Sequence, residues 1–220
     1  MGKFHVSDHP LVASKMAKLR DVRTGSKEFR EITCEISKML FYEATRNVLT
    51  VEETVITPIR DAKVRTIGVQ LALVPILRAG LGMVNGILRL MPTAKVGHLG
   101  IFRNPETLEP VEYYSKLPSD CAERLVFLLD PMLATGGTAA AAVSFLLKNG
   151  VPQHNIKFLC LLSCPEGVSR FHGEYQDVDI YAAAYDVFDK YADGNPRGLN
   201  NHGYIVPGLG DAGDRIFGTR

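Results

Sequence analysis

Five consecutive apolar residues, Leu125 to Leu129, constrain the fold of this chain more than any other feature. The run is too short for a helix and does not alternate with polar residues, so it predicts a strand buried on both faces of a mostly parallel sheet. Asp130 follows the run directly. Because open α/β sheets bind ligands outside the carboxyl ends of their strands, we expect Asp130 to lie at a ligand crevice.

A turn after Asp130 ends in Thr135-Gly136-Gly137-Thr138 and leads into an alanine-rich run, 139–148, with helical spacing of its apolar residues. Paired glycines let the backbone approach a ligand closely, and the first N–H groups of a helix favour an anion. We interpret the turn as a phosphate cradle. It is not an ATP-binding P-loop, because no Gly-Lys-Ser/Thr follows it. An ordinary turn in which Thr135 caps the helix is the alternative.

The rest of the chain alternates helical and strand patterns, which predicts a parallel sheet with right-handed crossovers. We expect helices at 8–20, 26–47, 81–90 and 166–172, a β-hairpin arm at 48–64, and strands at 71–76, 94–102, 156–162 and 178–184. The polar, proline-interrupted residues 105–118 predict a flap, and residues 186–201 predict a solvated loop. We expect one domain, 1–220, with an N-terminal segment over 1–65, a core over 66–185 and a C-terminal segment over 186–220.

Two of the predicted helices have defined apolar positions. In the helix over 8–20 these are Leu11, Met16 and Leu19. In the helix over 26–47 the apolar stripe consists of Phe29, Ile32, Ile36, Met39 and Leu40. Such a stripe predicts an amphipathic helix that packs on the sheet or across a subunit interface.

Composition argues against several classes of function. The formal net charge is +1, and Lys and Arg form no long run, so nucleic acid is not favoured as a partner. No stretch of about 18 apolar residues could span a membrane, and the N-terminus lacks the apolar core of a signal peptide. We therefore expect a soluble, cytoplasmic protein without a membrane partner. Four cysteines lack metal-ligand spacing, so we expect them to be reduced and assign no protein-held metal: Cys34, Cys121, Cys160 and Cys164.

Two arginines are expected near Asp130. The strand over 71–76 runs directly into a glycine-containing turn that begins Leu77-Arg78, and Arg103 follows the strand over 94–102. If these strands are neighbours, both guanidinium groups reach the same crevice, where they can offer a planar fork of donors to a diphosphate. The alternatives are a surface ion pair for Arg78 and a hinge residue paired with a glutamate for Arg103.

The C-terminal stretch, 203–219, contains a misleading glycine pattern. Gly208, Gly210 and Gly213 have the spacing of a dinucleotide-binding turn, which would suggest an NAD enzyme. The chain ends shortly after Gly213, so no βαβ unit can follow. We expect these glycines to present backbone N–H and C=O groups to a flat ligand.

The acidic strand end followed by Thr-Gly-Gly-Thr resembles the phosphoribosyl-diphosphate (PRPP) motif of type I phosphoribosyltransferases. The form Asp-Pro-Met-Leu-Ala-Thr-Gly-Gly, the Arg78 turn and the C-terminal stretch are similar to uracil phosphoribosyltransferases, and the resemblance covers almost the whole chain. It implies an α/β fold with a mostly parallel central sheet flanked by helices, a flap, a β-arm and a C-terminal hood over the base. Pro131 departs from the two consecutive acids of many phosphoribosyltransferases.

The resemblance also implies residue roles. Asp130 contacts the ribose hydroxyls of PRPP, Arg78 and Arg103 bind its pyrophosphate, and Asp211 reaches both PRPP and the base. The loop that holds PRPP after Asp130 consists of Pro131, Met132, Leu133, Ala134, Thr135, Gly136, Gly137 and Thr138. The uracil contacts are Ile205, Gly210, Asp211 and Ala212. The catalytic set is Arg78, Arg103, Asp130 and Asp211, and a cis peptide bond is expected directly after Arg78.

The implied reaction is uracil + PRPP → UMP + diphosphate. The edge of uracil presents acceptor, donor and acceptor, which a fixed backbone turn can match, whereas cytosine would oppose a donor with a donor. Because Pro131 replaces the second acid, we expect Mg²⁺ to be bound mainly through PRPP. Asp211 and desolvation under the flap are the two candidates for promoting loss of the N1 proton.

Two further functions share some of this pattern: a phosphoribosyltransferase for another nucleobase, and a PRPP- and uracil-sensing RNA-binding regulator. Family members are commonly dimers or larger, and several are activated by GTP. The resemblance therefore implies a homodimer or homotetramer with a GTP effector, although the sequence itself shows neither a GTP motif nor an interface.

Overall fold

The computed structural model describes residues 2–103, 110–191 and 194–219. Its central sheet has nine strands: β1 (Phe4–Val6), β4 (Leu71–Leu77), β5 (Lys95–Val96), β6 (His98–Arg103), β7 (Pro110–Lys116), β8 (Leu125–Leu129), β9 (Met132–Leu133), β10 (Ile156–Ser163) and β11 (Asp179–Tyr185). The main path runs β1-β11-β10-β8-β4-β6-β7, with β5 beside β4 and β9 beside β10. All pairs are parallel except β6 with β7. The predicted α/β class with a mostly parallel sheet is confirmed.

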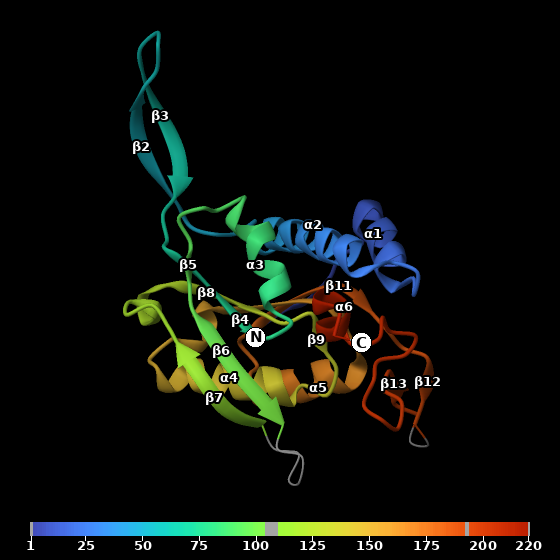
Figure 1. The fold of residues 1–220 in the computed structure, drawn as a ribbon. Helices are drawn as coiled ribbons and strands as arrows, with labels where there is room; N and C mark the ends of the chain where they lie inside the picture. Colours follow the sequence, from blue (N-terminus) through green and yellow to red (C-terminus); the bar gives the residue numbers. More distant parts are fainter. Residues whose placement is uncertain (1, 104–109, 192–193, 220) are drawn as a thin grey trace.

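Helices cover both faces of this sheet (Figure 1). They are α1 (Pro10–Arg20), α2 (Ser26–Ala44), α3 (Leu81–Leu88), α4 (Gly137–Lys148), α5 (Pro165–Glu174) and α6 (Ala212–Phe217), with short 3₁₀ turns η1 (Cys121–Glu123) and η2 (Gln153–Asn155). Helices α1, α2 and α3 lie over one face, and α4 and α5 lie under the other. This is the layered arrangement that buries a parallel sheet on both sides.

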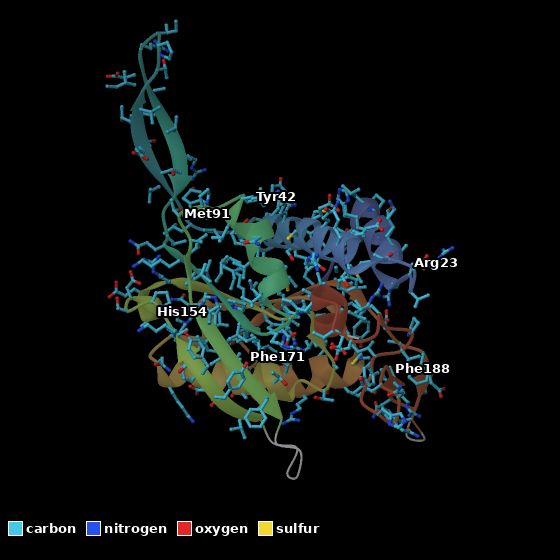
Figure 2. The ribbon with its side chains drawn as sticks, in the orientation of Figure 1. Arg23, Tyr42, Met91, His154, Phe171 and Phe188 are labelled. Atoms are coloured by element: carbon cyan, nitrogen blue, oxygen red, sulfur yellow. The ribbon has the colours of Figure 1, made fainter. Side chains whose placement is uncertain are left out.

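The central strand β8 is buried on both faces, as its unbroken apolar run predicts. Phe127 and Leu129 belong to the core beneath α2, where the Phe127 ring lies 4.8 Å from that of Phe41. Val126 and Leu128 belong to the opposite core, between the sheet and helices α4 and α5. In that core Phe171 of α5 lies against the sheet (Figure 2).

The two N-terminal helices differ slightly from the sequence prediction. In α2 the predicted stripe is buried except for Met39, which is half-buried, and the helix ends at Ala44. In α1 Leu11 is 50% exposed, and Val12 is buried together with Met16 and Leu19. Helix α1 begins at Pro10, so its inward stripe of Val12, Met16 and Leu19 has the i, i+4, i+7 spacing of a helix face.

Part of the predicted flap is a regular strand at the edge of the sheet. Within 105–118, residues Pro110–Lys116 form β7, an edge strand antiparallel to β6. Among the described residues β7 pairs with β6 alone, so its polar and aromatic side chains can stay in solvent while the backbone pairs. The prediction for 105–109 falls outside the described residues.

The predicted solvated loop over 186–201 is also only partly correct. The short strands β12 (Asp189–Lys190) and β13 (Pro196–Arg197) form an exposed antiparallel pair next to Phe188, which Figure 2 labels. At the two ends of the segment, however, Asp186 and Leu199 are buried. At the second end, the Glu166 carboxylate of α5 accepts hydrogen bonds from the backbone N–H groups of Gly198 and Leu199, each at 3.1 Å. These bonds hold that end of the segment against α5.

The β-hairpin arm is confirmed, as β2 (Thr50–Ile56) and β3 (Asp61–Ile67), and it projects from the body of the protein (Figure 1). No helix within the described residues is both long and apolar enough to cross a bilayer. The four cysteines are unpaired, with Cys34 half-buried and the others buried.

Candidate active site

Sheet topology brings two strand ends to the same edge. Strands β4 and β8 are parallel neighbours, and Pro75 lies opposite Leu129 in their register. The chain therefore leaves β8 at Asp130 and leaves β4 at Arg78 on the same side of the sheet, as the sequence predicts.

Two hydrogen bonds hold Asp130 at the end of β8, one from its backbone to β10 and one to its side chain from the loop that follows. Its N–H donates to the carbonyl of Leu159 at 3.2 Å, and its Oδ1 accepts the N–H of Met132 at 3.2 Å. Burial raises the pKa of Asp130 to about 7, and the hydrogen bond from Met132 opposes this rise. A carboxyl group with a pKa close to neutrality at a cavity wall is typical of functional sites.

The loop after Asp130 has the geometry of an anion cradle. Gly136 has φ +77°, a left-handed conformation that favours glycine, and α4 begins at Gly137. Behind the loop, the Cys164 thiol donates to the carbonyl of Ala134 at 3.0 Å. Burial raises the pKa of that thiol to about 12, so it remains a donor. The loop thus presents the N-terminus of α4 to the cavity.

Arg78 lies in the turn between β4 and α3, with its side chain 60% exposed. Its Cζ is 5.7 Å from the centre of the Phe217 ring, and its Nη2 is 4.0 Å from Asp214 Oδ1. These weak contacts leave the guanidinium accessible at the cavity wall. A cis peptide bond is present here, but it joins Leu77 to Arg78 and so precedes the arginine, contrary to the expectation that it follows.

The C-terminal segment forms a tight turn followed by α6. Ile205 is buried, Val206–Pro207 is a cis peptide, and Gly208 and Gly210 have φ of +69° and +81°. Asp211 caps α6, since its Oδ1 accepts the N–H of Asp214 at 2.8 Å. Gly208 and Gly210 therefore lie in this turn, and Gly213 lies in α6. The described residues around these glycines form no βαβ unit, as the sequence indicates.

Arg215 attaches this segment to the N-terminal helices. Its guanidinium donates to four backbone carbonyls, those of Leu19, Asp21, Thr24 and Leu209, at 2.6 to 3.4 Å. Its Cζ also lies 4.4 Å from the centre of the Phe29 ring. No sequence pattern indicated this role, because the acceptors are main-chain atoms and most of them are distant along the chain.

Residues of these elements line two adjoining cavities. The larger, of about 470 Å³, is lined by Asp130, Met132, Leu133, Ala134, Thr135, Gly136, Thr138, Ala139, His202, Gly203, Tyr204 and Asp211. The smaller, of about 320 Å³, is lined by Arg78, Ala79, Met132, Ala134, Gly203, Tyr204, Ile205, Gly210, Asp211, Ala212 and Gly213. The walls that they share include Met132, Tyr204 and Asp211. The carboxylate at 130 and the C-terminal turn thus meet at one site.

The structure brings together most, but not all, of the predicted site residues. Pro131 and Gly137 belong to the loop but do not line either cavity. Arg103 ends β6, where it pairs with Pro110, and its side chain lies outside the described residues. The sequence prediction missed Tyr204, which lines both cavities; its position next to Ile205 was the available signal.

Comparisons with known proteins agree with this geometry. The sequence model of the uracil phosphoribosyltransferase family matches residues 6–219. A uracil phosphoribosyltransferase of Bacillus licheniformis is 54% identical and one of Exiguobacterium sibiricum is 53% identical, each over 221 residues and 100% of both chains.

Solved structures agree as well. A protein of Aquifex aeolicus is 38% identical with a TM-score of 0.86, and the match covers 97% of each chain. The adenine phosphoribosyl transferase of Trypanosoma brucei shares the fold, with a TM-score of 0.57, 15% identity and coverage of 84% of each chain. Given a family match that spans nearly all of its length and full-length relatives above 50% identity, this chain belongs to the uracil phosphoribosyltransferase family.

Proposed function

We propose that this chain transfers the 5-phosphoribosyl group of PRPP to N1 of uracil, giving UMP and diphosphate. One observation carries the proposal: the Asp130 strand end and the C-terminal turn line adjoining cavities that share Met132, Tyr204 and Asp211. A sugar phosphate in the larger cavity would face a planar base in the smaller one. Holding the two reactants in this way replaces a bimolecular encounter by a unimolecular step.

In the PRPP half of the site, the loop from Pro131 to Thr138 holds the 5′-phosphate at the N-terminus of α4. The Asp130 carboxylate accepts hydrogen bonds from the ribose hydroxyls. Because burial raises the pKa of Asp130 to about 7, binding of these donors favours its ionised form and releases a proton near neutral pH.

In the diphosphate half, we assign Arg78 and Arg103 to the leaving group, which gains charge as the bond to the anomeric carbon breaks. Mg²⁺ carried by PRPP would neutralise part of this charge. Asp130 is the one acidic residue of the loop that follows β8, and Mg²⁺ readily keeps water ligands, so the site fits an ion carried mainly by PRPP.

In the uracil half, Ile205, Gly210 and Ala212 line the smaller cavity, where backbone groups match the edge of the base. Uracil loses its N1 proton as N1 attacks the anomeric carbon and diphosphate leaves. Asp211 lies between the two cavities and is our candidate for the proton acceptor. A phosphoribosyltransferase for another base would share the Asp130 loop but would need a different edge pattern in this turn.

The test is diphosphate release from Mg²⁺ and PRPP with uracil, compared with cytosine, orotate and hypoxanthine. We expect turnover with uracil alone. Turnover with another base and not with uracil would reassign the substrate. Running the uracil reaction with and without GTP, and measuring the molar mass in solution, tests the proposed GTP effector and the homodimer or homotetramer.

An RNA-binding regulator would give a different pattern. It would retard RNA in a gel shift, with affinity that falls steeply as salt increases. The near-neutral net charge of +1 does not favour that result.

Replacing Arg78 by Ala should weaken diphosphate recognition. The guanidinium makes only weak contacts with the protein, so its removal leaves the fold intact. We expect the KM for PRPP to rise roughly tenfold or more, as for a lost charged hydrogen bond, and the thermal protection by PRPP to fall. If PRPP protected Arg78→Ala from heat as well as wild type, Arg78 would not bind it. The KM for uracil, which should change little, is the internal control.

A further inference from the structure

Gly208 lies at the centre of the C-terminal turn, between Ile205 and Gly210, and is held at both of its backbone polar groups. Its N–H donates to Asp186 Oδ2 at 2.9 Å, and its carbonyl accepts from Arg20 Nη1 at 2.7 Å. Arg20 and Asp186 also form a two-pronged ion pair, with Nη1 to Oδ2 at 2.7 Å and Nη2 to Oδ1 at 2.6 Å. The three residues close a ring, which we name the Gly208 clamp.

The clamp is built on rigid regions of the protein. Asp186 is 6% exposed and directly follows β11, and its N–H donates to Ser163 at the end of β10 at 2.9 Å. Arg20 is the last residue of α1. An ion pair with little access to water and with hydrogen bonds at several of its atoms is strongly directional, because breaking either partner leaves a buried group unpaired.

The turn has little freedom to adapt. Gly208 has φ +69°, and a Cβ at this position would collide with the carbonyl oxygen of Ile205. The N–H of Val206 donates to the carbonyl of Gly198 at 2.9 Å, and the carbonyl of Leu209 accepts from Arg215 at 2.9 Å. The orientation of the peptide groups between Ile205 and Gly210 therefore depends on the clamp at Gly208.

We propose that Arg20 and Asp186 are positioning residues that fix the base-recognition turn and so determine affinity and selectivity for uracil. Neither residue lines the two cavities of the proposed active site, so they act through Gly208. The inference rests on the proposed function, because it assigns the smaller cavity to uracil. Its main effect falls on the base half of the site, because Ile205, Gly210 and Ala212 line the smaller cavity only, whereas most residues that line the larger cavity belong to the end of β8, the loop after it and α4.

The test compares steady-state kinetics of Asp186→Asn and wild type, with uracil and PRPP each varied in turn. An amide oxygen in the place of Oδ2 can still accept from Arg20 and Gly208, but the amide carries no charge and its NH2 group would face Arg20 Nη2. The ion pair and one of its two prongs are lost, so the clamp weakens. We expect the KM for uracil to rise roughly tenfold, the range for a hydrogen bond to a charged group, while the KM for PRPP changes less than about twofold, the size of effects without a direct contact. Discrimination against cytosine should also fall.

Substitutions of Arg20 give a series of variants with a graded loss of the ion pair. Arg20→Lys keeps a charged donor but cannot form the two-pronged pair, and Arg20→Met removes the donors and keeps the apolar stem. The KM for uracil should increase from wild type to Arg20→Lys to Arg20→Met. The double variant Arg20→Met with Asp186→Asn should have a KM close to that of the worse single variant, since both changes break the same unit.

The control is another two-pronged arginine–aspartate ion pair, far from the turn. Arg124 is 6% exposed and pairs with Asp120 through Nε at 2.8 Å and Nη2 at 2.6 Å, before the N-terminal end of β8. Asp120→Asn should lower the melting temperature in a similar way to Asp186→Asn and leave the KM for uracil unchanged. This variant separates loss of stability from loss of base positioning.

The outcomes are distinct. A rise in the KM for uracil at least fivefold larger than that for PRPP, absent in Asp120→Asn, supports the clamp. Equal rises, no rise, or the same rise in Asp120→Asn overturns it. If Asp186→Asn does not fold, Arg20→Lys is judged by the same criterion. A wild-type protein that releases no diphosphate with uracil overturns the proposed function and the clamp together. An active wild type whose variants change the KM values for uracil and for PRPP equally overturns the clamp alone.

Discussion

Asp130→Asn is expected to lower kcat/KM for PRPP by roughly 10- to 100-fold, the equivalent of about 1.5 to 3 kcal/mol for a hydrogen bond to a charged group. The substitution keeps the shape of the side chain and removes its charge. The ribose hydroxyls would then face an amide that offers one acceptor atom in place of two. Unchanged kcat/KM for PRPP would remove Asp130 from the site.

The same substitution should stabilise the ligand-free protein at neutral and alkaline pH. Burial raises the pKa of Asp130 from its ordinary value, near 4, to about 7, so between these values the folded state binds a proton that the unfolded state has lost. Stability therefore falls as the pH rises through this window, and the full cost is present above pH 7. Asn carries no charge to bury, so the variant avoids this cost.

Thermal unfolding of ligand-free wild type and Asp130→Asn at several pH values measures this effect. At pH 8 we expect the variant to be more stable by on the order of 2 kcal/mol, since the cavity gives the carboxylate some access to water. For a chain of this size that is about 5 °C in melting temperature. Below pH 4 the difference should disappear. A variant less stable than wild type at pH 8 would contradict the cause assigned to the pKa shift.

Local signals in the sequence were sufficient for the elements that line the larger cavity, β8 and α4. The apolar run before Asp130 has no polar position and must be buried on both faces, and the paired glycines after it mark the start of a helix. Each of these features depends only on a few neighbouring residues, so a single sequence is enough to predict it. The position of Arg78 beside Asp130 was predicted on the condition that their strands are neighbours, because parallel strands place their carboxyl ends on one edge. The pairing of β4 with β8 meets that condition.

Features that depend on distant pairing could not be predicted in this way. The segment at β7 is too polar for a core strand, and only the presence of β6 beside it makes a strand of it. The contact of Asp186 with Arg20 joins residues 166 positions apart, and it buries a carboxylate in a segment whose composition indicates a solvated loop. Periodicity and turn chemistry carry no information on such partners.

Gly80→Ala should damage activity and stability together, although it adds a single methyl group. Gly80 precedes α3 with φ −57°, a conformation open to any residue, so no backbone strain is involved. A Cβ there would collide with the carbonyl oxygen of Leu129 and lie 2.7 Å from that of Ile76. Backbone atoms cannot swing aside as a side chain can, so the turn that carries Arg78 must move away from β8.

That displacement would separate Arg78 from Asp130, which directly follows Leu129. We expect a loss of stability of about 1 to 3 kcal/mol from overpacking. Because a shift of about 1 Å in a reacting group can cost roughly 100-fold in rate, we expect kcat/KM for PRPP to fall by a factor of that order. Thermal unfolding and steady-state kinetics of the same preparation measure both.

Gly173→Ala is the matched control, because the change is identical and the surroundings are not. Gly173 lies in α5 with open space around its missing Cβ, so alanine there should stabilise the protein by about 0.4 to 1 kcal/mol and leave turnover unchanged. If Gly80→Ala behaved like Gly173→Ala, the close approach of the α3 turn to β8 would not matter for the reaction. A selective loss in Gly80→Ala would instead show that the distance between the two strand ends, set by the absence of one methyl group, is what aligns the diphosphate with the ribose.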